Sequence, residues 1–194
     1  MAAVTFALLH RIVIGLWLTI AAVWLVGAFT AKPAERRQSA GSRGLHMVFA
    51  IVAYVIGFSK GLEHTALARK FVPPSQVVVA VALLFVIAGI AFAIWARFAL
   101  GRNWSGQVTI KQDHTLILRG PYTIVRNPIY SGLLLAMLGS AIAYREFRGL
   151  IALGLVLVLL LFKIRIEERF MSQRFGEQYA AYKRQVKALI PFVY

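Results

Sequence analysis

The chain contains no cysteine, and only 7 of its 194 residues are acidic. The absence of cysteine excludes disulfide bonds, a catalytic thiolate and any metal site with cysteine ligands. Charged residues make up 15% of the chain, compared with roughly 25% in a typical soluble domain, and 60% of the residues are hydrophobic. So few polar residues cannot cover a soluble globule, and the same composition excludes a disordered chain. The composition therefore indicates a membrane protein.

Basic residues outnumber acidic residues by 22 to 7, which gives a formal net charge of +15. In a soluble protein this excess would favour nucleic-acid binding. In an apolar chain, basic residues between hydrophobic runs orient the protein and contact anionic lipid headgroups. We therefore expect membrane lipids, and no nucleic acid, among the partners.

Five runs of 14 or more residues lack Asp, Glu, Lys and Arg, and they predict the membrane-spanning segments. The runs are residues 12–31, 45–59, 77–96, 129–144 and 149–162. The pattern predicts an all-α integral membrane protein with about five transmembrane helices, the last two forming a short helical hairpin. The charged stretch 163–187 is predicted to be a separate amphipathic helix that lies on the membrane surface or packs under the bundle. A short extended segment is expected within residues 107–118.

The basic residues also predict an orientation. With five spans, 16 Lys and Arg residues fall on the side of loop 97–126 and the C-terminal tail, and 6 fall on the other side. The positive-inside rule places that loop and the tail in the cytoplasm, so we expect a multi-pass protein of the cell membrane. The chain is expected to form one membrane domain, 1–194, in which 1–99 supply three helices and 100–194 carry the chemistry.

A polar segment precedes the fourth apolar run. Asn127 is a suitable N-cap residue, and Pro128 suits the first helical position. This local explanation does not account for Arg126, which stands at the mouth of a membrane helix beside Tyr122 and Tyr130. An arginine at a helix N-terminus is an arrangement that binds anions.

Two of the seven acids, Glu167 and Glu168, stand together at the end of the last apolar run. They could neutralise Arg165 and Arg169, or one could accept hydrogen bonds from a cationic or hydroxylated ligand. His114 in the long loop could bind a ligand or be structural. The sequence has no metal-binding HxxxH or HExxH motif and no Gly-rich phosphate-binding motif, so we expect no metal.

The order of these residues resembles the isoprenylcysteine carboxyl methyltransferase family and its relatives, the phospholipid N-methyltransferases. The resemblance covers about half of the chain and rests on an ordered set of residues. The set is Leu100, Gly101, Arg102, Asn103, Trp104, Ser105, His114, Leu116, Gly120, Pro121, Tyr122, Arg126, Asn127, Pro128, Tyr130, Gly132, Glu167, Glu168, Phe175, Gly176, Tyr179, Tyr182, Val186 and Pro191.

The resemblance implies a membrane enzyme that moves a methyl group from S-adenosyl-L-methionine to a lipophilic or prenylated acceptor that arrives from the bilayer. It implies catalytic roles for Arg126 and Glu168, and contacts from Trp104 and Tyr130 to the acceptor. The cytoplasmic loop and its neighbours would bind the cofactor. The implied cofactor-binding residues are His114, Leu116, Gly120, Pro121, Tyr122, Arg126, Asn127, Pro128, Tyr130, Glu167 and Glu168.

One position departs from the family, because Asn127 stands where the family has histidine. Asparagine forms hydrogen bonds but cannot exchange a proton, so only an orienting role is expected there. A carboxylate acceptor would need no base, whereas an amine acceptor would require one, with Glu168 or Glu167 as the candidate. Sterol reductases that use NADPH share the Arg-Asn-Pro-x-Tyr pattern and the ending 190–194, so a reductase is the alternative enzyme. A non-catalytic membrane scaffold is the alternative outside enzymes.

Overall fold

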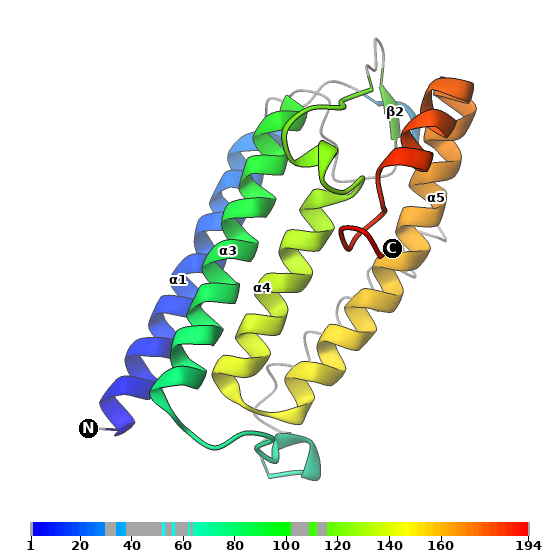
Figure 1. Cartoon of the computed structure of the whole chain (residues 1–194). Helices are drawn as coiled ribbons and strands as arrows, with labels where there is room; N and C mark the ends of the chain where they lie inside the picture. The colour runs from blue at the N-terminus through cyan, green and yellow to red at the C-terminus, as the bar shows by residue number, and fades with distance from the viewer. Residues whose placement is uncertain are drawn as a thin grey trace.

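Helices dominate the computed structural model, which describes residues 2–29, 34–37, 52, 56, 62, 64–101, 109–111 and 116–193. The α-helices within these residues are α1 (Ala2–Phe29), α3 (Gln76–Leu100), α4 (Pro128–Tyr144) and α5 (Phe147–Gln185) (Figure 1). Two short 3-10 helices, η2 (Ala66–Ala68) and η4 (Gly120–Thr123), lie in the connections, and strands β1 (Ala34–Arg37) and β2 (Thr109–Lys111) pair antiparallel. The extended segment predicted within 107–118 is thus confirmed over the three residues of β2, whereas β1 was not predicted.

Helices α1, α3 and α5 are long and apolar enough to cross a membrane, and α4 is a shorter apolar helix. Helix α3 contains the whole predicted run 77–96, and α4 contains the whole run 129–144. The Ser75 hydroxyl starts α3 by accepting a hydrogen bond from the Val78 amide at 3.1 Å. The predicted third run, 45–59, lies outside the described residues except for two positions, so the number of five spans remains a prediction.

The predicted boundary between the last membrane helix and a separate charged helix at residue 163 is wrong. Helix α5 continues through it, and the chain changes direction at Gly176, whose φ of 49° and ψ of −124° are not helical. Residues after 163 include many good helix formers, and charge alone does not end a helix once its side chains can reach water. Glycine tolerates the positive φ that the sharp bend requires. The last turns of α5 therefore fold back toward the start of α4 (Figure 1).

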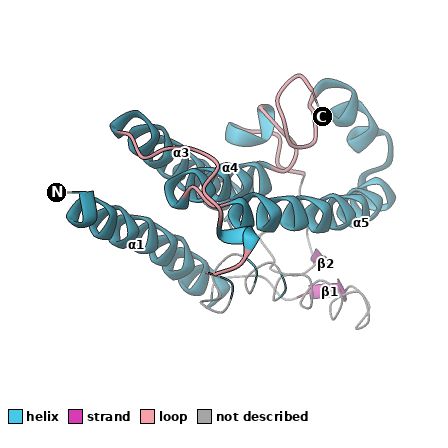
Figure 2. Ribbon diagram, turned by 90° about the horizontal axis from the view of Figure 1, so that it is seen from below, coloured by secondary structure: helices cyan, strands magenta, loops and turns pink. Residues whose placement is uncertain are grey.

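Small residues allow α3 and α4 to pack closely. A Cβ atom at Gly132 would lie 2.5 Å from the Gly89 carbonyl oxygen and 2.7 Å from the Ala93 amide nitrogen, so only glycine fits. Close backbone approach of this kind is how helices associate in lipid, where no hydrophobic force favours their contact. Figure 2 shows α3 and α4 side by side between α1 and α5. This pair is the frame that holds the first turn of α4 in place.

The two ends of the bundle differ in chemistry. At one end a two-residue turn joins α4 to α5. There the Glu146 carboxylate forms ion pairs with Lys70, whose Nζ lies at 2.5 Å, and with Arg148. The other end gathers the end of α3, helix η4, the first turn of α4 and the bend of α5 (Figure 1). The polar segments that carry the predicted site residues therefore meet at a single end of an apolar bundle.

Candidate active site

The tail after α5 runs along the segment that leads into α4. The Arg126 amide donates to the Lys187 carbonyl at 2.7 Å, and the Asn127 amide donates to the Ala188 carbonyl at 3.0 Å. Val125, which is fully buried, forms an isolated parallel bridge with Lys187. These backbone bonds hold the tail against the entrance of α4, and the side chains of the site are arranged around this contact.

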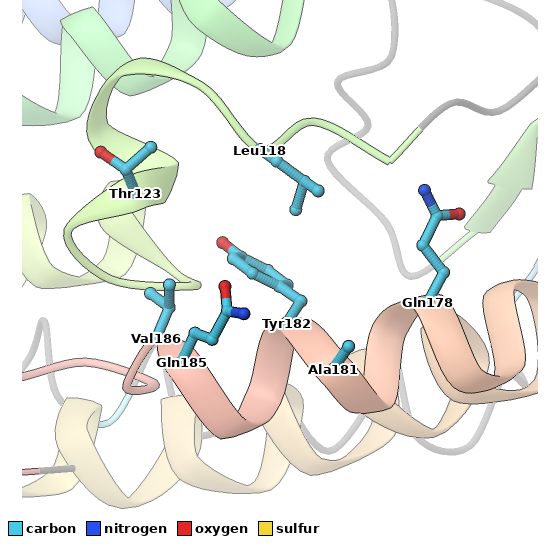
Figure 3. Close-up of a pocket in the computed structure, with 7 residues that line it drawn as sticks. All are labelled: Leu118, Thr123, Gln178, Ala181, Tyr182, Gln185 and Val186. Atoms are coloured by element: carbon cyan, nitrogen blue, oxygen red, sulfur yellow. The ribbon is translucent and has the colours of Figure 1, made fainter.

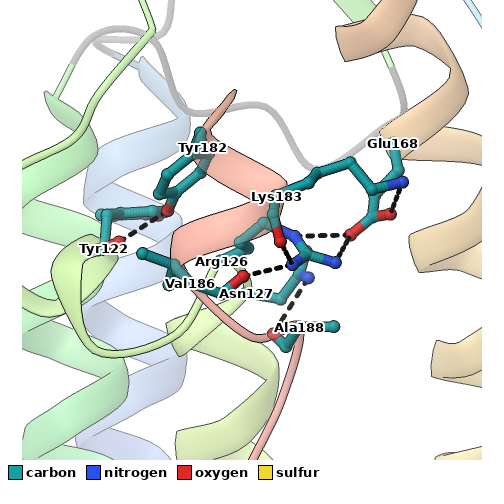
Figure 4. A network of polar contacts seen from close by, with 8 residues as sticks. All are labelled: Tyr122, Arg126, Asn127, Glu168, Tyr182, Lys183, Val186 and Ala188. Carbon is teal, nitrogen blue, oxygen red and sulfur yellow. Dashed lines mark hydrogen bonds and ion pairs between the residues drawn. The ribbon is translucent and has the colours of Figure 1, made fainter. Parts of the chain in front are cut away.

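Arg126 and Glu168 form the central ion pair of the site. Arg126 donates from Nε at 2.9 Å and from Nη2 at 2.6 Å to the same carboxylate oxygen of Glu168 (Figure 4). The Arg126 Nη1 group donates to the carbonyls of Val186 and Lys183, and Lys183 Nζ lies 2.9 Å from the other oxygen of Glu168. The side chains of Arg126 and Glu168 are 10% and 14% exposed, whereas that of Lys183 is 41% exposed. The Arg126–Glu168 pair is therefore far less screened by water than the Lys183–Glu168 pair.

The neighbouring carboxylate has a different partner. Tyr130, in the first turn of α4, donates its hydroxyl hydrogen bond to Glu167 at 2.7 Å. Two adjacent acids of α5 thus reach two different residues at the entrance of α4, Arg126 just before the helix and Tyr130 in its first turn.

Two tyrosines connect η4 to the last turns of α5. The hydroxyl of Tyr182 donates to the Tyr122 carbonyl at 2.6 Å, and both side chains are buried. Burial raises the pKa of the Tyr122 phenol well above its ordinary value, and the nearby Tyr182 and Glu167 raise that pKa further. Tyr122 is therefore a neutral hydrogen-bonding group at physiological pH and cannot serve as a base.

Asn127 occupies the predicted N-cap position, but its side chain does not cap the helix. Its Nδ2 group instead donates to the Ala188 carbonyl at 3.1 Å, and the Ser131 hydroxyl donates to the Leu189 carbonyl at 2.6 Å. The expected capping role is thus corrected, because the docked tail offers the amide a carbonyl acceptor. Pro128 does take the first helical position, as predicted.

A cavity of about 480 Å³ is lined in part by Tyr182 and Val186, between η4 and the last turns of α5 (Figure 3). Among the described residues that line it there is no carboxylate, lysine or arginine. The lining residues are Leu118, Thr123, Gln178, Ala181, Tyr182, Gln185 and Val186. Two amides, a hydroxyl and an aromatic ring suit an uncharged ligand group that forms hydrogen bonds, and the volume falls in the range of small-molecule sites.

The structure places most, but not all, of the predicted site residues. Gly120, with a φ of 60°, and buried Pro121 shape η4, and half-buried Leu116 enters the same connection. His114 and Trp104 lie outside the described residues. Among the described residues no group of three or more His, Asp or Glu side chains could hold a metal ion.

Sequence reasoning assigned none of Lys183, Tyr182, Ser131 and the tail carbonyls to the site, although Tyr182 belongs to the ordered set that carries the family resemblance. The carbonyls carry no sequence signal, because every residue has one. Lys183 and Tyr182 face the site only because of the bend at Gly176, so helical spacing from Glu168 could not have found them.

These features define a membrane protein with a paired-charge site at one end of its helices, and comparisons identify its family. The sequence profile of the phospholipid methyltransferase family matches residues 77–178, so the chain belongs to this family. This confirms the resemblance inferred from the ordered motifs.

Several proteins of known name are similar in sequence to about half of this chain. Protein-S-isoprenylcysteine O-methyltransferase B of Arabidopsis thaliana is 33% identical over 115 residues, which are 57% of this chain and 58% of that protein. The cobalt-zinc-cadmium resistance protein CzcN of Cupriavidus metallidurans is 32% identical over 94 residues, covering 47% of this chain and 43% of that protein. The chain thus spans less than two thirds of the length of these relatives.

A solved structure has a similar fold. The eukaryotic intramembrane Ras methyltransferase ICMT, an isoprenylcysteine carboxyl methyltransferase, superimposes with a TM-score of 0.51 at 25% sequence identity. The match covers 80% of this chain and 54% of that protein. The family, the apolar helices and this neighbour together identify a multi-pass membrane protein.

Proposed function

We propose that this protein is a membrane methyltransferase that moves a methyl group from S-adenosylmethionine to the carboxylate of a lipophilic acceptor, such as a prenylated cysteine or another isoprenoid-type lipid. The observation that carries the proposal is the convergence of Arg126, just before α4, and Tyr130, in its first turn, with Glu167 and Glu168 from α5. It lies at one end of an apolar bundle, where a water-soluble cofactor and a bilayer-soluble acceptor can both arrive. The names of the relatives support the same reaction.

The donor set of the site fits this cofactor. S-adenosylmethionine carries a carboxylate, an ammonium and a sulfonium group on an uncharged nucleoside. Arg126 offers a cation, Glu167 and Glu168 offer anions, and the adjoining cavity presents uncharged amides from Gln178 and Gln185. Each charged group of the cofactor would thus have a side chain of opposite charge available, and the uncharged nucleoside would have amides to form hydrogen bonds with. When bound, the cofactor supplies a methyl group that its positive sulfur activates toward nucleophiles.

The residues of the loop and of the α4 entrance complete the proposed cofactor site. By the family resemblance, Leu116, Gly120, Pro121, Asn127 and Pro128 contribute to binding, with His114 in the loop. In the described part of the chain, Asn127 is engaged with the tail carbonyl of Ala188, which supports an orienting role.

The chemistry of the site favours a carboxylate acceptor over an amine. A carboxylate is already ionised at neutral pH, so its reaction needs correct positioning in a dry site and no base. Asn127 cannot exchange a proton, and Tyr122 stays protonated because burial raises its pKa. Glu168 is bonded to Arg126, which disfavours its use as a base. An amine acceptor would require Glu167 or Glu168 to accept a proton.

Two measurements test the proposal on the purified full-length protein. S-adenosylhomocysteine should raise the melting temperature, because a ligand that binds only the folded state stabilises it, and NADP should not. Tritium-labelled methyl groups should then pass from S-adenosylmethionine into a total lipid extract. Stabilisation by NADP alone would support the sterol-reductase alternative, and no response to either ligand with no transfer would support a scaffold.

We also propose that the site end faces the cytoplasm, as the distribution of basic residues predicts. The chain has no native cysteine, so a cysteine introduced at exposed Arg119 gives a single labelling site. A membrane-impermeant maleimide should label it only after the cells are opened. Labelling of intact cells would reverse the orientation.

A further inference from the structure

Lys163 lies on the face of α5 that is turned toward α4, one helical turn before Glu167. Its neighbour Ile164 is 2% exposed, Leu160 is 7% exposed, and Lys163 itself is half-buried. Four residues of α-helix rise about 6 Å, so the lysine stands deeper along the apolar helix than the two acids. Its Nζ atom lies 5.4 Å from the ring centre of Tyr130, the residue whose hydroxyl binds Glu167.

Lys163 carries its charge in a place where charge is costly. Basic side chains within membrane helices pair with acids or backbone carbonyls, reach the interface, or mark a ligand pathway. The ion pairs found among the described residues join Glu146 to Lys70 and Arg148, and join Glu168 to Arg126 and Lys183. Lys163 takes part in none of them. Its ammonium group instead lies over the face of the Tyr130 ring, a cation–π contact that steadies the group without supplying an ion-pair partner.

We propose that Lys163 binds the carboxylate of the lipophilic acceptor and thereby selects acceptors with an anionic head. This inference rests on the proposed function. The ammonium lies between the apolar length of α5, from which a lipid would come, and the Tyr130–Glu167 contact at the site. A cation at this position attracts a carboxylate and repels an ammonium, so it favours O-methylation over N-methylation. An ester product has no charge, so it loses this attraction and leaves more easily.

Substitutions at one position and at a matched control test the assignment. Lys163→Gln removes the charge and keeps most of the length, and Lys163→Arg keeps the charge. Arg169→Gln is the control, because it removes one positive charge from an exposed position on the same helix. The probes are N-acetyl-S-prenylcysteine and its carboxamide, which differ only in the charged group. Binding of both is measured by thermal stabilisation in neutral detergent, so the comparison does not depend on turnover.

The wild type and Lys163→Arg should bind the carboxylate at least about tenfold more tightly than the carboxamide, as expected for one charge-assisted hydrogen bond. Lys163→Gln should bind the two probes equally, with its KM for the carboxylate raised by about tenfold and kcat little changed. Arg169→Gln should behave as the wild type. An unchanged preference in Lys163→Gln would overturn the assignment.

Three further outcomes separate the explanations. If Lys163→Gln weakens binding of anionic phospholipid added to the micelles but leaves probe preference intact, the lysine binds headgroups and the inference is wrong. If the wild type transfers methyl groups and binds S-adenosylhomocysteine but its probe preference does not depend on Lys163, the inference alone fails. If the wild type neither transfers methyl groups nor binds that product, the proposed function fails, whatever the probe preference.

Discussion

The two cationic partners of Glu168 should differ greatly in energetic value. Arg126 makes two hydrogen bonds to one oxygen of Glu168, and both side chains are at most 14% exposed. Charge-assisted hydrogen bonds in a shielded position predict a coupling energy of about 2–3 kcal/mol for this pair. Lys183 makes a single contact and is 41% exposed, so its coupling to Glu168 should be about 0.2–1 kcal/mol.

Two double-mutant cycles measure the difference. One combines Arg126→Gln with Glu168→Gln, and the other combines Lys183→Gln with Glu168→Gln. The free energy of unfolding is obtained by denaturant titration in mixed detergent micelles, followed by tryptophan fluorescence. Each cycle cancels the independent effects of the single changes, such as the lost contacts of Arg126 with tail carbonyls.

The reasoning would be refuted by equal couplings in the two cycles, or by an Arg126 coupling below about 0.5 kcal/mol, since either would mean that burial does not protect the pair. The single change Glu168→Gln should also weaken S-adenosylhomocysteine binding, by about 1.5–3 kcal/mol if its carboxylate contacts the ligand. Unchanged affinity by calorimetry would restrict Glu168 to a structural role.

Three further predictions concern packing, the tail and pH. Gly132→Ala should destabilise the protein by about 1–3 kcal/mol, because its Cβ would lie 2.5 Å from a backbone oxygen of α3. Gly154→Ala is the control and should not destabilise it, because open space surrounds that position. The melting temperatures of the two variants are compared. Asn127→Asp should lower the free energy of unfolding by about 0.5–1.5 kcal/mol and expose the tail to carboxypeptidase, because aspartate cannot donate the hydrogen bond to the Ala188 carbonyl. A more stable Asp variant would instead indicate that the side chain caps α4. Burial tends to raise the pKa of Glu146, but hydrogen bonds from two neighbouring basic side chains outweigh it and lower that pKa. The ionised Glu146 therefore stabilises the fold fully above its unfolded pKa of about 4.3, and this stabilisation is lost as the pH falls through the lower folded pKa. Below pH 5 the melting temperature of the wild type should therefore fall with pH more steeply than that of Glu146→Gln.

The core helices and the candidate site residues could be predicted from the amino-acid sequence alone. Runs 77–96 and 129–144 became α3 and α4 because a backbone in hydrocarbon must satisfy its hydrogen bonds within the segment, which is a local requirement. The position of Pro128 at the start of α4 is local for the same reason. Arg126 and Glu168 could be expected at one site because both stand at the polar ends of apolar runs.

The partners of these residues, by contrast, depend on how the helices pack in the folded protein. Arg126 and Glu168 are 42 positions apart, and their contact depends on the rotation of α4 and α5 about their axes, which hydropathy does not record. The bend at Gly176 brings the tail to α4 and redirects Asn127 from helix capping to Ala188. Apolar spans follow from each segment's own free energy of solvation, whereas the pairing of charges depends on packing between segments, so only the folded arrangement determines it.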